Sequence, residues 1–155
     1  MAYERLLLDD GRAIEYLAVG DSAADLLFLL PGAPCAAVEF PHVISAAVQR
    51  ALRVAVYSRP GYVGSTRDEG RTVLRAGADT AALADHLGAA EFFVAGWSAG
   101  GPFALACAAA LPHRVRACAV LAGLAPVVEA GHAARDWYSP EEWAERKELS
   151  RLPVA

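Results

Sequence analysis

The sequence predicts an α/β fold, with a mostly parallel β-sheet that carries helices on both faces. Short apolar runs alternate along the chain with longer segments of helical periodicity, a pattern typical of a parallel sheet covered on two sides. The turn signal Asp9-Asp10-Gly11-Arg12 separates the first two strands, so these are expected to form a hairpin. The composition changes after Gly123, and we expect a core at residues 1–123 followed by a second region at residues 124–155.

Composition and charge exclude several classes of protein. A hydrophobic content of 55% with 21% charged residues is typical of a folded domain, and 155 residues suffice for one core. The net charge of -4 and the lack of a basic run disfavour binding to nucleic acid or to an anionic membrane. Cys35, Cys107 and Cys118 have no metal-like spacing, so we expect buried thiols in a reducing cytoplasm, without a metal or cofactor.

The apolar and glycine patterns place strands and helices along the chain. A hairpin is expected from residues 4–8 and 13–19, and buried strands from residues 26–30, 52–57, 92–95 and 115–121. Helices are expected at residues 36–51, 71–87 and 99–111. The second of these has Val73 in its apolar stripe, with Asp79 and His86 on its solvated face. A charged helix is expected to begin at Ser139.

Gly96, Ser98 and Gly100 form a G-x-S-x-G pattern between a predicted strand and a predicted helix. A nucleophilic serine has to project from the end of a strand, and the tight turn that presents it needs glycines two residues to either side. The N-terminus of the following helix favours negative charge near the serine. Ser98 is therefore the candidate nucleophile, and the alternative is a glycine-rich turn that carries an incidental serine.

Two backbone N–H groups are candidates for binding a negatively charged oxygen. Acyl transfer requires two fixed donors for its oxyanion. The first is the N–H of Ala99, directly after the serine, and the second is the N–H of Ala33, in the loop that follows a buried strand. Pro34 has no N–H and cannot serve. The alternative for this loop is an ordinary proline–glycine turn.

Four motifs together resemble the serine α/β-hydrolase family. They are Pro31-Gly32-Ala33-Pro34, Arg59-Pro60-Gly61-Tyr62-Val63-Gly64-Ser65, Gly96-Trp97-Ser98-Ala99-Gly100-Gly101-Pro102 and Pro112-His113-Arg114-Val115. The resemblance covers about residues 4–123 and implies the α/β-hydrolase fold, which we expect to stop after about the sixth strand. It also implies a cap, or lid, that begins near Leu124.

The resemblance implies a reaction class as well as a fold. It implies hydrolysis of a small ester-like substrate through a serine ester intermediate, with no cofactor or metal. Serine at the nucleophile position points away from epoxide hydrolases and haloalkane dehalogenases, which use aspartate, and leaves ester, lactone, amide and carbon–carbon hydrolysis open. Trp97 and Tyr62 are candidates for lining the pocket, with core packing as the alternative for each.

The partners of Ser98 in a catalytic triad are not recognisable in the sequence, although chain order places an acid and then a histidine after the serine. His113 follows the helix after the serine and is expected roughly 20 Å away from it. His132 lies in the expected cap and is the other candidate base. Glu129 and Asp136 are expected to be solvated. The triad acid and histidine therefore stay unassigned.

Three interpretations follow from these residues. The first is a serine hydrolase whose acid and histidine are not in this chain. The second is a non-catalytic protein of the same fold that binds a ligand or a partner, since one fold hosts many functions. The third is a complete minimal hydrolase that uses His132. We favour the first, because the core motifs match and the triad partners do not.

The last predicted strand, residues 115–121, leaves an apolar edge unpaired. Such an edge is open to pairing with another strand. We therefore expect copies of the chain to associate through this edge or to be poorly soluble. A monodisperse monomer in size-exclusion chromatography would contradict this expectation.

Overall fold

The computed structural model describes residues 2–33, 37, 40–124 and 139–141. The chain divides into two compact units, Met1–Gly123 and Leu124–Ala155. Most of the second unit, including most of the expected charged helix, lies outside the described residues. The assignment of residues 124–155 to a cap therefore stays a prediction.

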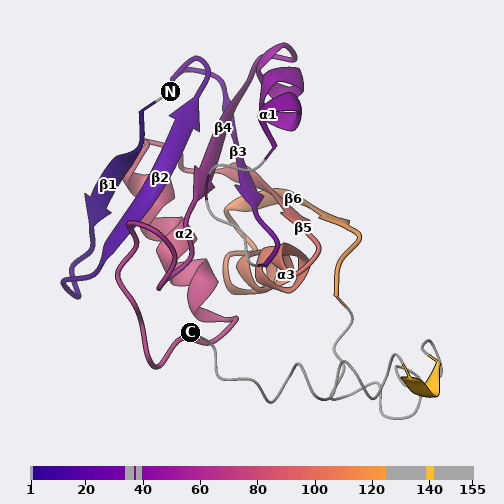
Figure 1. Cartoon of the computed structure of the whole chain (residues 1–155). Helices are drawn as coiled ribbons and strands as arrows, with labels where there is room; N and C mark the ends of the chain where they lie inside the picture. Colours follow the sequence, from indigo (N-terminus) through magenta and orange to yellow (C-terminus); the bar gives the residue numbers. More distant parts are fainter. Residues whose placement is uncertain (1, 34–36, 38–39, 125–138, 142–155) are drawn as a thin grey trace. The chain divides into compact units, whose positions relative to one another are not determined.

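A six-stranded sheet runs through the first unit (Figure 1). Its strands are β1 (Glu4–Leu7), β2 (Ala13–Val19), β3 (Asp25–Leu30), β4 (Leu52–Tyr57), β5 (Phe92–Trp97) and β6 (Val115–Leu121). They lie in the order β1-β2-β4-β3-β5-β6. β1 and β2 form the predicted hairpin, β2 is antiparallel to β4, and the pairs from β4 through β3 and β5 to β6 are parallel. The prediction of a mostly parallel sheet is confirmed.

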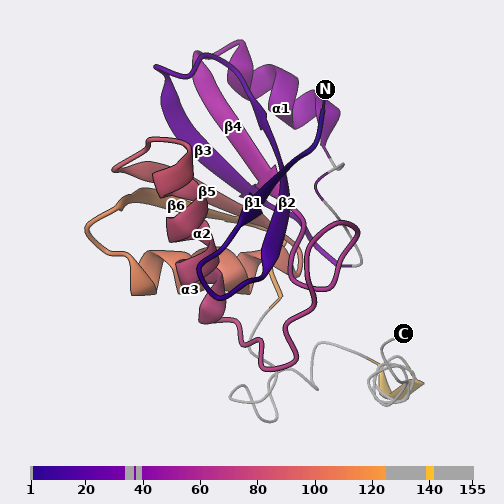
Figure 2. The same ribbon diagram turned by 90° about the vertical axis from the view of Figure 1, so that its left-hand side faces the viewer.

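Helices cover both faces of the sheet (Figure 2). They are α1 (Pro41–Val48), α2 (Arg75–His86) and α3 (Gly100–Ala110). α1 packs through Ile44 and Ala47 against one face, which includes Val54 and Val56 of β4. α2 and α3 cover the opposite face in a cluster with Phe28, Val94 and Tyr57. Neighbouring side chains along a strand point to opposite faces and so pack into two separate apolar clusters. Because both faces are apolar, these strands appear in the sequence as uninterrupted apolar runs.

Two helices begin later than predicted. α1 starts at Pro41, not at residue 36, and Phe40 before it has a left-handed φ of 82°. Proline suits the first position of a helix because an N–H group at that position would have no partner within the helix, so nothing is lost when it is absent. α2 starts at Arg75, not at residue 71. Arg71 instead donates a hydrogen bond to the carbonyl oxygen of Pro60, which keeps it in the loop.

The edge strand β6 pairs with β5 and with no other strand of the described residues. Val120 and Leu121 of β6 are exposed, so the unpaired edge is apolar as expected. Association of copies at this edge stays a prediction. Cys118, also on β6, is exposed, so the prediction that it is buried is wrong, whereas Cys107 is buried as predicted.

The described residues carry neither a membrane-spanning helix nor a metal-binding cluster. None of the helices there is long and apolar enough to cross a membrane. In that part of the chain no group of three or more histidine, cysteine, aspartate or glutamate side chains is arranged to hold a metal ion.

Candidate active site

The predicted oxyanion loop and the predicted serine turn leave neighbouring strands at the same edge of the sheet. β3 and β5 are parallel, with Leu30 paired to Gly96. The two loops touch directly: a Cβ added to Gly32 would lie 3.2 Å from the Cβ of Ser98 and 3.4 Å from the carbonyl oxygen of Trp97. The carboxyl edge of parallel strands is where ligands usually bind in such sheets.

Ser98 adopts a strained backbone conformation at the junction of β5 and α3. Its φ is 51°, in the left-handed region that costs a non-glycine residue roughly 1–2 kcal/mol. Its N–H donates to the carbonyl oxygen of Leu121 at 2.9 Å, and its carbonyl oxygen accepts from the N–H of Gly101 at 3.0 Å. These bonds hold the turn in place, so the half-buried side chain of Ser98 is presented at the strand end.

Close contacts with backbone atoms explain why the two residues that flank the serine turn, Gly96 and Gly100, are glycines. A Cβ on Gly100 would overlap the carbonyl oxygen of Leu30 and lie 2.8 Å from that of Pro31. A Cβ on Gly96 would lie 2.6 Å from the carbonyl carbon of Gly100. Contacts under 3.0 Å require backbone movement, so only glycine fits at either position.

The strain at Ser98 predicts that glycine stabilises this position. We expect Ser98→Gly to raise the free energy of unfolding by about 0.5–1 kcal/mol, because relief of roughly 1–2 kcal/mol of left-handed strain outweighs roughly 0.5–1 kcal/mol of added chain entropy. Urea denaturation followed by circular dichroism measures the change. Ser22→Gly is the matched control, since Ser22 lies in an exposed turn without a positive φ and should lose stability. A loss at both positions would contradict strain at Ser98.

The N–H groups of Ala33 and Ala99 lie on the two sides of this junction. Ala99 caps the N-terminus of α3, where the helix dipole favours negative charge. Ala33 is exposed and follows Gly32 in the oxyanion loop. Within the described part of the chain neither N–H makes a hydrogen bond, and their role as oxyanion donors stays a prediction.

A buried arginine holds the oxyanion loop, a role that the sequence did not reveal. Arg59 is only 6% exposed and donates from Nη2 to the carbonyl oxygen of Gly32 at 2.5 Å. Its guanidinium carbon lies 5.4 Å from the ring centroid of Tyr62 and 4.7 Å from that of Phe103. Such cation–π contacts fix the guanidinium in place. The only sequence signal for this role is an arginine directly after a buried strand.

The loop that carries Arg59 is itself tied to β2. The Ser65 hydroxyl accepts a hydrogen bond from the N–H of Glu15 at 2.9 Å and donates to the carbonyl oxygen of Ser58. The Ser58 hydroxyl donates to a Glu15 carboxylate oxygen at 3.1 Å and accepts from the N–H of Ala37 at 3.3 Å. The last bond reaches Ala37, after the oxyanion loop, so Ser58 and Ser65 together connect that residue to the sheet.

A cavity of about 270 Å³ opens beside the oxyanion loop, and Ala33, Arg59, Tyr62 and Phe103 are among the residues that line it. Tyr62 therefore lies at a cavity next to a predicted oxyanion donor. Trp97 does not line it. Its side chain is 46% exposed, and its ring packs against that of Phe40 with the centroids 5.8 Å apart.

No histidine of the described ranges hydrogen-bonds Ser98. His113 is exposed and lies beyond the far end of α3, which separates it from the serine as expected. His42 is exposed on α1. His86 is exposed as expected, but its Nε2 also lies 3.0 Å from the hydroxyl oxygen of Tyr16. The other candidates lie outside the described residues: His132, Glu129 and Asp136.

The buried thiol of Cys107 does not compete with Ser98 as a nucleophile. Cys107 lies on α3, and burial raises the pKa of its thiol, which disfavours the reactive thiolate. Its sulfur lies 3.3 Å from the Thr80 hydroxyl, which in turn lies 3.1 Å from the Tyr57 hydroxyl. Burial also raises the pKa of Tyr57. This buried trio therefore stays uncharged and structural.

A serine turn at the carboxyl edge of a mostly parallel sheet, beside the loop that follows β3, is typical of an α/β-hydrolase core. The family model of the alpha/beta hydrolase fold matches residues 25–146, so the chain belongs to this family. A comparison with curated proteins finds no matching sequence.

Solved structures agree with this assignment. An alpha/beta hydrolase fold protein from Nakamurella multipartita is 31% identical with a TM-score of 0.67, over 79% of this chain and 41% of that one. Epoxide hydrolase A from Mycobacterium thermoresistibile is 27% identical with a TM-score of 0.65, over 77% and 39%. A carboxylesterase structure from Nitrososphaera gargenis shares the fold at 21% identity and a TM-score of 0.72, over 78% and 46%. The chain thus matches less than half the length of each of these proteins.

Proposed function

We propose that this chain carries the nucleophile of a serine hydrolase that transfers an acyl group from an ester-, lactone- or amide-type substrate to water. The observation that carries the proposal is Ser98, held at a φ of 51° between β5 and α3 and in contact with the oxyanion loop. Hydrolases are among the proteins of similar fold, and they include a carboxylesterase and an epoxide hydrolase. The serine favours the ester-type reaction over epoxide opening.

The reaction proceeds in two steps. The Ser98 oxygen bonds to the substrate carbonyl carbon as its proton passes to a general base, and the leaving group departs with a proton. The N–H groups of Ala33 and Ala99 bind the oxyanion that forms, and water then releases the acyl group. Because no described residue supplies the acid or the base, we place both outside the described residues, in the main interpretation outside this chain.

Turnover of a small neutral ester tests the proposal. In the main interpretation, with the base outside this chain, we expect the chain alone to hydrolyse 4-nitrophenyl butyrate only slowly. Where a base is present, we expect Ser98→Ala to lower kcat by about 10³-fold or more, since loss of the serine removes the covalent route. Ser22→Ala is the matched control, because Ser22 lies in an exposed turn and not at the serine turn. Equal turnover by wild type and Ser98→Ala would contradict the proposal.

Two further outcomes would distinguish the two other interpretations from the main one. Loss of turnover in His132→Ala would make His132 the base of a complete minimal hydrolase, and unchanged turnover would exclude that role. No turnover by the wild type, together with ligand binding that Ser98→Ala leaves unchanged, would favour a non-catalytic binding protein of the same fold.

A further inference from the structure

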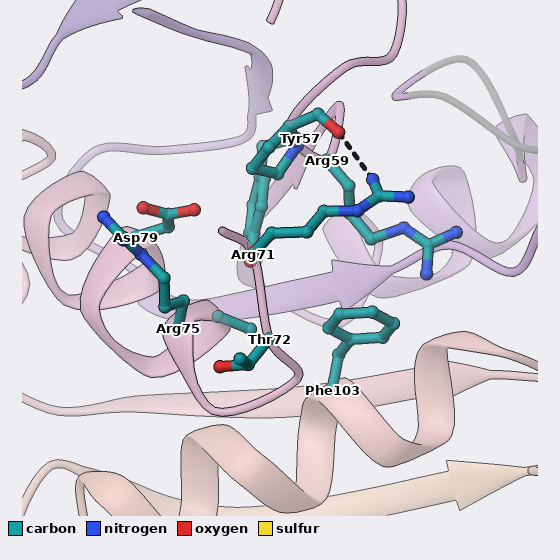
Figure 3. A pocket seen from close by; sticks show the side chains of 9 residues that line it. Tyr57, Arg59, Arg71, Thr72, Arg75, Asp79 and Phe103 are labelled. Atoms are coloured by element: carbon teal, nitrogen blue, oxygen red, sulfur yellow. Dashed lines mark hydrogen bonds between the residues drawn. The ribbon is translucent and has the colours of Figure 1, made fainter. Parts of the chain in front are cut away.

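Two arginines face the cavity beside the oxyanion loop. Among the residues that the structure describes, the cavity of about 270 Å³ is lined by Ala33, Arg59 and Arg71 together with uncharged residues, and by no carboxylate. Figure 3 draws the adjoining pocket, which shares Arg59, Arg71, Thr72 and Phe103 with this cavity and is also lined by Asp79. It shows the guanidinium groups of Arg59 and Arg71 on the same side, above the ring of Phe103. One wall of this cavity therefore concentrates positive charge next to a proposed oxyanion donor.

Arg71 differs from the other arginines of this region. Arg12 and Arg75 form ion pairs with Asp79 and Asp68. Arg71 forms no ion pair with any carboxylate in the part of the chain that the structure describes. Its charge is therefore available to a ligand.

The Arg71 side chain is nevertheless held in one place. Its Nη1 donates to the carbonyl oxygen of Pro60 at 2.6 Å (Figure 3). Its guanidinium carbon lies 5.7 Å from the ring centroid of Tyr62. These contacts use one N–H group and one face of the Arg71 guanidinium. Its other N–H groups can therefore donate hydrogen bonds to a further acceptor. A positioned guanidinium loses less conformational entropy when it binds a ligand than a freely moving one.

We propose that this cavity binds a carboxylate group of the substrate, so that the ester cleaved at Ser98 carries a second, anionic end. This inference rests on the proposed function and adds a substrate class to it. A guanidinium matches the planar geometry of a carboxylate with two parallel hydrogen bonds. Thr72, which also lines the cavity, lies just before the N-terminus of α2, whose dipole favours an anion. A volume of about 270 Å³ suits a short acid such as a half-ester of succinate.

A binding experiment on the Ser98→Ala chain tests the site without turnover. The probes are monomethyl succinate and its uncharged isostere methyl succinamate, titrated by NMR. We expect the acid to bind about tenfold more tightly than the amide, because charge-assisted hydrogen bonds exceed neutral ones. Arg71→Gln should remove most of this difference. Arg67→Gln is the matched control and should preserve it, since Arg67 is exposed in the same loop and does not line the cavity.

The outcomes separate this site from the proposed reaction. Equal affinity for the two probes, no detectable binding of the acid, or an unchanged preference in a folded Arg71→Gln variant would overturn the carboxylate site. Circular dichroism establishes that the variants are folded. The expected preference in a chain whose ester hydrolysis is the same with and without Ser98 would support the site while contradicting the proposed function. Hydrolysis of 4-nitrophenyl butyrate without a preference for the acid would do the reverse.

Discussion

Replacing Gly100 by alanine is expected to lower the free energy of unfolding by about 3 kcal/mol or more, since overpacking against rigid atoms lies at the upper end of such effects. The new methyl group would overlap the carbonyl oxygen of Leu30 and lie 2.8 Å from that of Pro31. Both are backbone atoms at the end of β3, so no side-chain rotation relieves the overlap. Relief requires separating the serine turn from the oxyanion loop, which should also abolish any activity. Urea denaturation of the purified variant measures the loss.

Gly70→Ala is the control for Gly100→Ala. The nearest atom to a Cβ on Gly70 is a carboxylate oxygen of Asp68 at 3.8 Å, which is ordinary contact, and Gly70 has no positive φ. We expect this variant to remain within about 0.5 kcal/mol of the wild type. A similarly small effect for Gly100→Ala would show that the turn and the oxyanion loop are not packed as described.

Replacing Asp79 by asparagine is expected to lower the free energy of unfolding by about 2–3 kcal/mol, because breaking a buried ion pair leaves a charge without its partner. Asp79 is 3% exposed and accepts two hydrogen bonds from Arg12, at 2.7 and 3.3 Å. The hydrogen bond from Arg12 to Asp79 is the main reason that the pKa of Arg12 is raised above its usual value. Arg12 retains a hydrogen bond to Asp10, which keeps the loss below that of an isolated pair. Urea denaturation again gives the value.

Asp85→Asn makes the same chemical change on the exposed side of the same helix. Asp85 pairs with Arg114 at 2.7 Å, but its side chain is 68% exposed. Exposed pairs contribute about 0–1 kcal/mol, so we expect a loss below about 1 kcal/mol. Equal losses for the two aspartates would contradict the buried character of the Arg12–Asp79 pair.

Local signals in the sequence were sufficient for the strands and the serine turn. Runs such as residues 26–30 are typical of strands buried on both faces, and the glycines around Ser98 match a backbone that excludes a Cβ. The helix starts were harder to predict. Val73 fits an apolar helical stripe, yet it lies in a turn and is exposed, because the hydrogen bond from Arg71 to Pro60 keeps the preceding segment out of the helix.

Long-range pairing of charged groups could not be predicted from the sequence. Asp79 was expected on a solvated face, but it is buried because Arg12, which is 67 positions away, reaches it from the hairpin turn. The hydrogen bond from Arg59 to Gly32 likewise joins two loops that the sequence separates. No local pattern encodes such contacts, since they depend on the order of strands in the sheet. The triad partners are a different case, because no described histidine hydrogen-bonds Ser98, and the other candidates, His132, Glu129 and Asp136, lie outside the described residues.

Covalent labelling with a fluorophosphonate probe, located by mass spectrometry, tests most directly whether Ser98 is an activated nucleophile. We predict that any labelling falls on Ser98 and is lost in Ser98→Ala, because the probe reacts with a serine that has a base and an oxyanion site. Labelling of Ser98 would place the base in this chain or in an associated copy, whereas no labelling of a chain shown to be folded agrees with a base outside this chain. Labelling that persists in Ser98→Ala would contradict the assignment of Ser98 as the nucleophile.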